Sequence, residues 1–208
     1  MKHVVITIAR GFGSGGKAIG VALSEQLGIP CYEKEILRMA SDKSGISQAL
    51  FEETDEKLKR SFLKRVIGST PSNYTVEPSD KKFIHDNNLF NIQRKIIEEL
   101  ANTESCIIVG KCADYVLENR KNVIKVYVDA PMSSCIRSIK ERMGVGDMEA
   151  IRIINKTDKY RSDYYKYYTG GRDWKNPIYY DICLNSGTLG RKKCIEIIKE
   201  LYEERKAK

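Results

Sequence analysis

A glycine-rich stretch near the start of the chain has the residue types of a phosphate-binding loop. Residues 11–18 read GFGSGGKA, with four glycines in six positions and then a lysine. Glycines leave the backbone N–H groups of a loop open to an anion, and a lysine at this spacing reaches the outer phosphates of a nucleotide. The pattern predicts that phosphate groups are bound by Gly11, Gly13, Ser14, Gly15, Gly16, Lys17 and Ala18.

The residue after the lysine departs from the usual pattern. Phosphate-binding loops normally carry Ser or Thr there, and the hydroxyl group holds Mg²⁺. Ala18 and Ile19 offer no ligand to a metal ion, so Ser14, inside the loop, is the nearest substitute. The alternative interpretation is a purely structural turn between a strand and a helix, which would need fewer glycines and no lysine.

Short apolar runs separated by helical patterns predict a parallel sheet. Runs typical of buried strands lie at residues 4–9, 106–109, 123–128 and 182–184, with a shorter candidate at 30–32. Helical patterns occupy residues 17–27, 48–67, 88–101, 132–143 and 191–204. This alternation indicates an α/β fold with helices on both faces of the sheet. The glycine-rich loop therefore follows a strand and opens a helix, the context in which such a loop binds anions.

Two regions without strands interrupt the alternation. Residues 41–100 are predicted to form a helical insertion, and residues 144–176 form a second insertion that is basic and rich in tyrosine. A chain of 208 residues is long enough to bury one substantial core. We therefore expect a single domain over residues 1–208, with a core formed by about 1–40, 100–143 and 177–208.

The chain is basic, and the excess is concentrated. It carries 36 basic and 28 acidic residues, a net charge of +8. Residues 132–175 alone hold ten basic and six acidic side chains, which is half of that excess. A basic surplus favours anionic partners, whether nucleotide phosphates, anionic lipid or nucleic acid, although a solvated basic surface would give the same composition.

Cysteine usage and hydropathy predict the compartment. The six cysteines are dispersed without any C-x-x-C pair, which favours reduced thiols over a disulfide framework. No apolar run approaches the roughly 18 residues of a membrane span, and the first run is too short for a secretory signal. We expect a cytoplasmic protein with no membrane partner.

Several segments resemble the cytidylate kinase-like proteins, relatives of bacterial cytidylate kinase among the nucleoside monophosphate kinases. The segments are ITIARGFGSGGKAIGVALSEQLGIPCYEKEIL, CIIVGKCADYVL, VIKVYVDAP, NKTDKYRSDYYKYYTG and YDICLNS. The resemblance implies a P-loop NTPase-like, five-stranded parallel sheet. It also implies that the first insertion binds a nucleoside monophosphate and that the second is a lid over the phosphates.

The resemblance assigns roles to individual residues. It implies that Gly11 to Lys17 bind the donor phosphates, and that Asp158 and Arg161, in the sequence DKYR, hold the sugar and phosphate of the acceptor. Arg137 and Arg142 are the expected lid arginines, which with Lys17 would stabilise charge on the transferred phosphoryl group.

These charged residues also have ordinary structural explanations. Asp158 and Arg161 are three residues apart, as in a common intrahelical ion pair. Arg137 and Arg142 share one predicted helix with Glu141, which is equally typical of a solvated helix face.

At the end of the third strand the chain departs from the family pattern. Cytidylate kinases carry an acidic residue there and an arginine just after it, whereas this chain has Val109, Gly110 and Lys111. Lys111 is still expected to contribute charge at the acceptor, but without the bidentate fork of an arginine. A carboxylate that would organise the metal is missing, and Asp114 or Asp129 could replace it.

Two further departures flank the loop. Glu33 stands where an aspartate is usual after the second strand, and Arg10 brings a cation to a position that cytidylate kinases fill with an acid. Together they suggest altered metal handling or a different acceptor rather than loss of phosphate binding.

The function predicted from the sequence is an ATP- and Mg²⁺-dependent phosphotransferase that acts on a nucleoside monophosphate such as CMP or dCMP. One alternative is a nucleotide-binding module that has lost catalysis, which Ala18 and Val109 favour. A nucleic-acid-binding protein that uses the basic lid is less favoured, and it would bind with a steep salt dependence.

Overall fold

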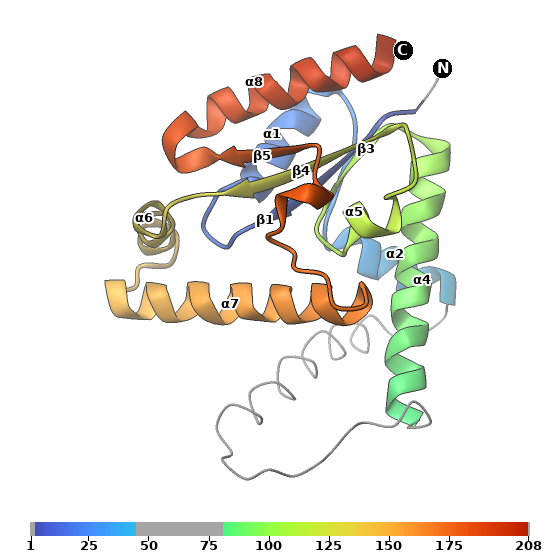
Figure 1. The fold of residues 1–208 in the computed structure, drawn as a ribbon, viewed down its shortest axis with the longest axis horizontal. Helices are drawn as coiled ribbons and strands as arrows, with labels where there is room; N and C mark the ends of the chain where they lie inside the picture. Colours follow the sequence, from blue (N-terminus) through green and yellow to red (C-terminus); the bar gives the residue numbers. More distant parts are fainter. Residues whose placement is uncertain (1–2, 45–80, 208) are drawn as a thin grey trace. The chain divides into compact units, whose positions relative to one another are not determined.

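The structure contains a parallel five-stranded sheet (Figure 1). The structure, a computed structural model, describes residues 3–44 and 81–207. The strands are β1 (Val5–Arg10), β2 (Cys31–Tyr32), β3 (Cys106–Val109), β4 (Val123–Asp129) and β5 (Ile182–Asn185), in the order β2-β3-β1-β4-β5. Every pairing is parallel. The predicted α/β fold is therefore confirmed, and each predicted strand differs from the observed one by a residue or less at either end.

Helices fill the connections between the strands. They are α1 (Gly16–Leu27), α2 (Glu35–Ser44), α4 (Lys81–Thr103), α5 (Ala113–Val116), α6 (Met132–Met143), α7 (Asp147–Tyr168) and α8 (Ser186–Ala207), with a 3₁₀ turn η1 (Pro177–Tyr179). The helical patterns found in the sequence did not include α2, α5 or α7, and the helix predicted at 48–67 lies outside the described residues. The second insertion is strandless as predicted and consists mainly of α7.

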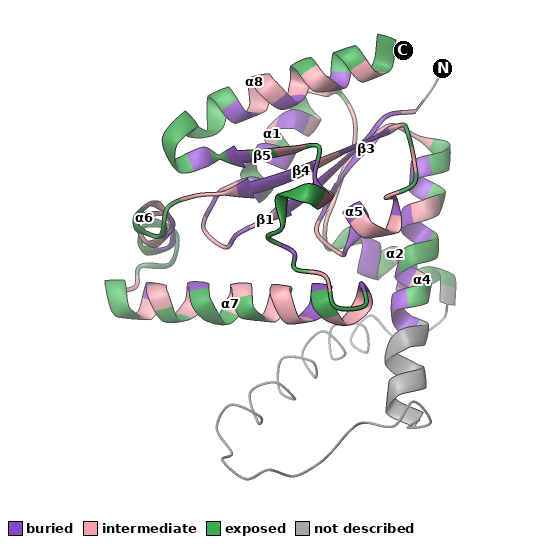
Figure 2. Cartoon of the chain, viewed as in Figure 1, coloured by how far each residue is buried: buried purple, intermediate pink, exposed green. Residues whose placement is uncertain are grey.

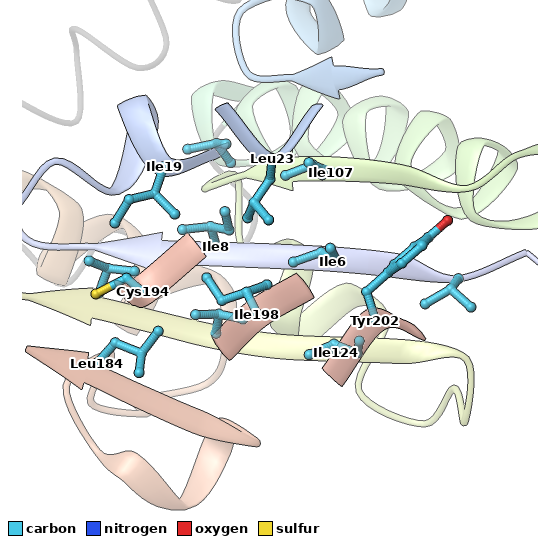
Figure 3. Packing of buried hydrophobic residues seen from close by; sticks show 14 residues of the cluster. Ile6, Ile8, Ile19, Leu23, Ile107, Ile124, Leu184, Cys194, Ile198 and Tyr202 are labelled. Carbon is cyan, nitrogen blue, oxygen red and sulfur yellow. The ribbon is translucent and has the colours of Figure 1, made fainter. Parts of the chain in front are cut away.

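Helices α1 and α8 cover one face of the sheet (Figure 3). Ile19 and Leu23, one helical turn apart on α1, are fully buried, and α8 contributes Cys194, Ile198 and Tyr202. These side chains pack against buried residues of β1, β3 and β4, among them Ile6, Ile8, Ile107, Val109, Ile124 and Val126. Figure 2 shows β1 and β3 buried along nearly their whole length, as expected for central parallel strands.

The opposite face is more polar and aromatic. Side chains alternate along a strand, so Ile124 and Val126 face the α1–α8 core while Lys125 and Tyr127 point the other way. The Tyr127 ring contacts Trp174 edge-on at 5.7 Å and Tyr180 at 5.1 Å, both measured between ring centroids. The segment that links α7 to β5 is thereby packed onto the sheet.

The register of the sheet brings the loop and the end of β4 together. Arg10, the last residue of β1, pairs with Val128, the residue before Asp129. Because parallel strands end at one edge, the glycine-rich loop, the end of β4 and the start of α8 meet there. This edge is where an α/β sheet normally binds its ligand.

The chain divides into two compact units, residues 1–33 with 97–208, and residues 34–96. All five strands and all residues of the candidate site belong to the first unit. The expected insertion at 41–100 and the expected lid at 144–176, within one domain, remain predictions. None of the helices in the described part of the chain is long and apolar enough to cross a membrane.

Candidate functional site

The backbone of the loop requires glycine at two positions. Gly13 and Gly15 have φ angles of 89° and 83°, in the left-handed region that other residues rarely adopt. Gly15 is also the N-cap of α1, and the first turn of that helix contains no acidic residue. The N–H groups of the first turn and the positive end of the helix dipole therefore meet no carboxylate from this helix, which favours an external anion.

The neighbours of the loop leave no room for further side chains. A Cβ on Gly11 would overlap the carboxylate of Asp129, and a Cβ on Gly13 would lie 2.9 Å from the Cβ of Cys135 on α6. Distances this short do not occur between real side chains. The loop is thus fixed by contact with the end of β4 and with α6, as well as by its own sequence.

Ser14 is engaged within the loop. Its buried hydroxyl group donates to the carbonyl oxygen of Gly11 at 2.9 Å and accepts from the N–H of Gly16 at 3.4 Å. The carbonyl oxygen of Ser14 accepts from the hydroxyl of Ser186 at 2.5 Å. These bonds hold the curve of the loop, and a metal ion at Ser14 would have to replace them. Its role as a metal ligand stays a prediction.

Glu33 joins two cations at the base of the loop. One of its carboxylate oxygens lies 2.6 Å from Nη2 of Arg10, and the other lies 2.6 Å from Nζ of Lys17. Burial acts to raise the pKa of Glu33, but the hydrogen bonds and charges of Lys17 and Arg10 outweigh it and lower that pKa. Burial also lowers the pKa of Arg10, although Glu33 opposes the shift. Lys17 remains largely exposed at the opening of the loop, with 60% of its side chain accessible.

Asp158 and Arg161 of α7 contact the loop, and their expected role at the acceptor stays a prediction. The Phe12 N–H donates to Asp158 Oδ1 at 2.7 Å, and Arg161 Nη1 donates to the Arg10 carbonyl oxygen at 2.9 Å. The two side chains also face one another at 3.6 Å, so the ion pair that we considered as an alternative is present as well. Burial and the neighbouring Arg10 cation lower the pKa of Arg161 to about 10. Burial raises the pKa of Asp158, against the effect of its bond to Phe12.

The two expected lid arginines are in different surroundings. The Arg142 guanidinium lies over the Phe12 ring, 5.1 Å from the ring centroid. The Arg161 guanidinium lies 5.3 Å from the same centroid. Arg137 is exposed on α6 and makes no hydrogen bond or ion pair within the described residues. Of the two, only Arg142 is brought to the loop in this structure.

Asp129, at the end of β4, lies against Gly11 of the loop. Its Oδ2 accepts from the Tyr127 hydroxyl at 3.3 Å and lies 3.9 Å from Nζ of Lys175, while Oδ1 accepts from the Ala130 N–H at 2.9 Å. The described residues contain no group of three or more His, Cys, Asp or Glu side chains that could hold a metal by themselves. Mg²⁺ is commonly held by one or two carboxylates together with substrate phosphates, and Asp129 fits such a site.

The turn after β3 has an unusual backbone. Gly110, Lys111 and Cys112 have φ angles of 79°, 57° and 53°, so two residues other than glycine are left-handed. A side chain on Gly110 would overlap the guanidinium of Arg10. Left-handed residues of this kind cost of order 1 kcal/mol or more each and are frequent at functional sites. Lys111 therefore occupies a strained turn beside the Arg10 cation.

Asp114 does not substitute for the missing carboxylate at the loop. It is 4% exposed and accepts from the Tyr165 hydroxyl at 2.7 Å. It lines a separate polar pocket of about 370 Å³, whose other walls include Lys125, Arg172 and Tyr179. Burial raises the pKa of Asp114 to about 6, although the bond from Tyr165 acts in the opposite direction.

Arg191 is a cation at the loop that the sequence analysis missed. A Cβ on Gly15 would lie 2.7 Å from Nε of Arg191. This arginine follows Gly190, whose φ of 76° and ψ of 153° interrupt α8. It is exposed and has neither an ion pair nor a hydrogen bond with any residue that the structure describes. Nothing in the local sequence marks it, because its proximity depends on the kink in α8.

Comparison with known proteins identifies the family of this chain. Residues 5–188 match the cytidylate kinase-like family over most of the chain. The chain belongs to the cytidylate kinase-like family. Membership of this family supports a phosphotransferase that binds nucleotides. No curated protein matches this cytidylate kinase-like protein in sequence.

Solved structures share the fold of this cytidylate kinase-like protein. An uncharacterized protein from Eubacterium ventriosum ATCC 27560 has 26% sequence identity and a TM-score of 0.70, over 97% of this chain and 99% of its own. A sugar kinase from Janibacter sp. HTCC2649, solved without ligand, has 13% identity and a TM-score of 0.50, over 95% of this chain and 93% of its own. At these identities the comparison with the sugar kinase shows the fold alone.

The buried carboxyl of Asp114 makes the stability of this cytidylate kinase-like protein depend on pH. The pKa of Asp114 in the folded protein, about 6, exceeds the ordinary value of 3.8. The stabilisation of the folded state that comes from this shift is therefore complete below pH 3.8 and is lost as pH rises through about 6. Asp114→Asn keeps an acceptor for Tyr165 without the charge. The unfolding free energy of the variant, relative to wild type, should rise by about 2 to 3 kcal/mol between about pH 4 and pH 7.

Urea unfolding of both proteins at several pH values measures this difference. A difference that stays constant over the range would contradict the assignment of a raised pKa to Asp114.

Proposed function

We propose that this chain is an ATP-dependent phosphotransferase that transfers a phosphoryl group to a nucleoside monophosphate such as CMP or dCMP. The observation that carries the proposal is the gathering of Lys17, Arg142 and Arg161 at one glycine-rich loop, from α1, α6 and α7. Phosphoryl transfer depends on positioning and on cations that stabilise charge on the transferred group. A solvated basic surface does not require such convergence.

Each part of the loop region has a proposed task. The backbone N–H groups from Gly11 to Lys17 and the start of α1 bind the donor phosphates, and Lys17 leaves Glu33 to contact the outer phosphate. Asp158 and Arg161 position the acceptor, with Lys111 adding charge. Mg²⁺, when bound, neutralises charge on the donor phosphates, and Asp129 is the carboxylate proposed to hold it.

A nucleotide-binding module without turnover is the second candidate. Ala18 supplies no metal ligand, and the hydroxyl of Ser14 is already bonded to Gly11. Backbone N–H groups and Lys17 provide most of the affinity for phosphates, whereas the missing hydroxyl acts mainly on metal geometry. Binding can therefore survive where catalysis has been lost.

A coupled phosphoryl-transfer assay separates these candidates. ATP and Mg²⁺ are supplied with a panel of nucleoside monophosphates and small hydroxylated acceptors, and we expect turnover to be highest with CMP or dCMP. In parallel, ATP at about 100 times its Kd adds about 2.7 kcal/mol of stability. At about 2 to 4 °C per kcal/mol, that amounts to a rise in Tm of roughly 5 to 11 °C.

The control for this assay is Lys17→Ala, which should reduce the Tm shift without unfolding the free protein. Turnover of no acceptor, with a normal Tm shift, would favour the binding module. Absence of any Tm response to millimolar ATP, GTP, ADP or CMP would remove the proposal altogether.

Arg161 tests the acceptor site. Arg161→Lys keeps the positive charge but loses the planar fork that binds a phosphate with two hydrogen bonds. We expect kcat/KM for the monophosphate to fall about 10-fold, from the loss of about 1.4 kcal/mol of transition-state binding, while the KM for ATP changes little. Steady-state kinetics with each substrate varied in turn gives both values. Unaltered acceptor kinetics would leave Arg161 only its bonds to Arg10 and Asp158.

Arg191 tests the donor side. We propose that its guanidinium contacts donor phosphates from the α8 side of the loop, because it lies at Gly15 without a carboxylate partner in the described part of the chain. Arg191→Ala should weaken ATP binding about 10-fold, equivalent to a charge-assisted bond of about 1.4 kcal/mol. Isothermal titration calorimetry measures the change.

The matched control for Arg191 is Lys193→Ala, which removes the same charge from the same helix. Lys193 pairs with Glu196 at 3.2 Å, and its loss should leave ATP affinity within about twofold of wild type. Equal effects of the two substitutions would mean that only the overall charge matters.

A further inference from the structure

We infer that Phe12 is a positioning residue, whose ring holds the guanidinium groups of Arg142 and Arg161 at the loop before a nucleotide binds. The inference deepens the proposed function. It rests on that function for its kinetic consequence, but not for the contact itself. Phe12 is the only large side chain between Gly11 and Gly16.

The ring lies within cation–π range of both arginines. The central guanidinium carbon of Arg142 is 5.1 Å from the ring centroid, and that of Arg161 is 5.3 Å from it. Cations attract the negative face of an aromatic ring at distances up to about 6 Å. The arginines come from α6 and α7, so the ring links two helices to the loop.

The Phe12 side chain also packs against apolar residues. It packs against the small core between α6 and α7, which is formed by Cys135, Ile139, Ala150 and Ile154. The ring therefore belongs to this core while it also contacts the two cations. Neither α6 nor α7 could shift far from the loop without breaking contacts of the same ring.

The backbone of Phe12 provides a further link to α7. Its N–H donates to Asp158 Oδ1 at 2.7 Å, and the neighbouring Arg10 carbonyl accepts from Arg161 at 2.9 Å. Two hydrogen bonds and one ring contact thus tie α7 to residues 10–12. Because of these bonds Arg161 should stay at the loop when the ring is removed, whereas Arg142 is exposed and would return to solvent.

An aromatic ring also makes the gathering of like charges less costly. Arg10, Arg142 and Arg161 all lie near the loop, and the Arg10 cation lowers the pKa of Arg161 further after the larger effect of burial. The negative ring face of Phe12 offsets part of this repulsion without adding a carboxylate that would repel phosphate. A leucine would keep an apolar side chain against the α6–α7 core, although a smaller one, and would lack this property.

Three variants distinguish the effect of the aromatic ring on kcat from the effect of lost side-chain volume. Phe12→Leu keeps an apolar side chain and should lower kcat for phosphoryl transfer about 10-fold, with the KM for ATP within about twofold of wild type. Phe12→Tyr keeps the ring and should restore kcat to within about twofold of wild type. Val145→Ala loosens the same α6–α7 core without touching a cation, and should leave kcat unchanged.

A spectroscopic measurement tests the contact independently of turnover. The side-chain Nε–Hε signal of Arg142, assigned by its loss in Arg142→Lys, should show an upfield ring-current shift in wild type and in Phe12→Tyr. The shift should be absent in Phe12→Leu. A wild-type signal without that shift would overturn the inference, whatever the kinetics.

The kinetic outcomes are equally decisive. A normal kcat in Phe12→Leu would overturn the positioning role. So would a fall in kcat in Phe12→Tyr and Val145→Ala as large as the fall in Phe12→Leu. If wild type transfers phosphate to no acceptor, the proposed function fails, and the ring-current shift still decides whether Phe12 holds Arg142.

Discussion

The close packing around the glycines of one loop is the constraint on which the site depends. Gly11 abuts Asp129 at the end of β4, Gly13 abuts Cys135 on α6, and Gly15 abuts Arg191 on α8. A methyl group at Gly13 would collide with the backbone of α6, and one at Gly11 or Gly15 would displace the side chain of Asp129 or Arg191. The same lack of side chains that opens the backbone N–H groups to phosphate therefore lets three parts of the chain converge on the loop.

Electrostatics around this loop are balanced by two carboxylates. Glu33 neutralises part of the charge of Arg10 and Lys17, and Asp158 does the same for Arg161. Without them, so many cations at one edge of a sheet would repel one another. Both carboxylates also make bonds that a nucleotide could compete for, because Glu33 binds Lys17 and Asp158 occupies the Phe12 N–H. The free protein thus already contains anionic partners for its phosphate-binding groups.

Arg10 and Glu33, which both depart from the family pattern, form an ion pair with each other. Each looked like an isolated change in the sequence, but the two side chains form a largely buried ion pair at 2.6 Å. Removing either partner would leave an uncompensated charge, which is costly inside a protein. Gly110 belongs to the same arrangement, since the Arg10 guanidinium fills the space that its side chain would need. The pair therefore accounts for two departures and for one glycine in the turn after β3.

The sheet, the loop and four of the described helices could be predicted from the amino-acid sequence, because their signals are local. Apolar runs of buried strands, glycine spacing and the Lys17 position all lie within short windows. The helix α5 was missed since four residues contain too little periodicity to detect. The family resemblance, rather than spacing, brought Asp158 and Arg161 into consideration, because the same i, i+3 spacing fits an ordinary ion pair.

Which cations reach the loop depends on how the helices pack, and the sequence did not reveal it. Arg137 and Arg142 look alike in sequence and both are exposed on α6, yet only Arg142 lies over the Phe12 ring. Arg191 approaches Gly15 because α8 kinks at Gly190. Such contacts join residues more than a hundred positions apart, and their geometry depends on packing between whole elements, which no local pattern encodes.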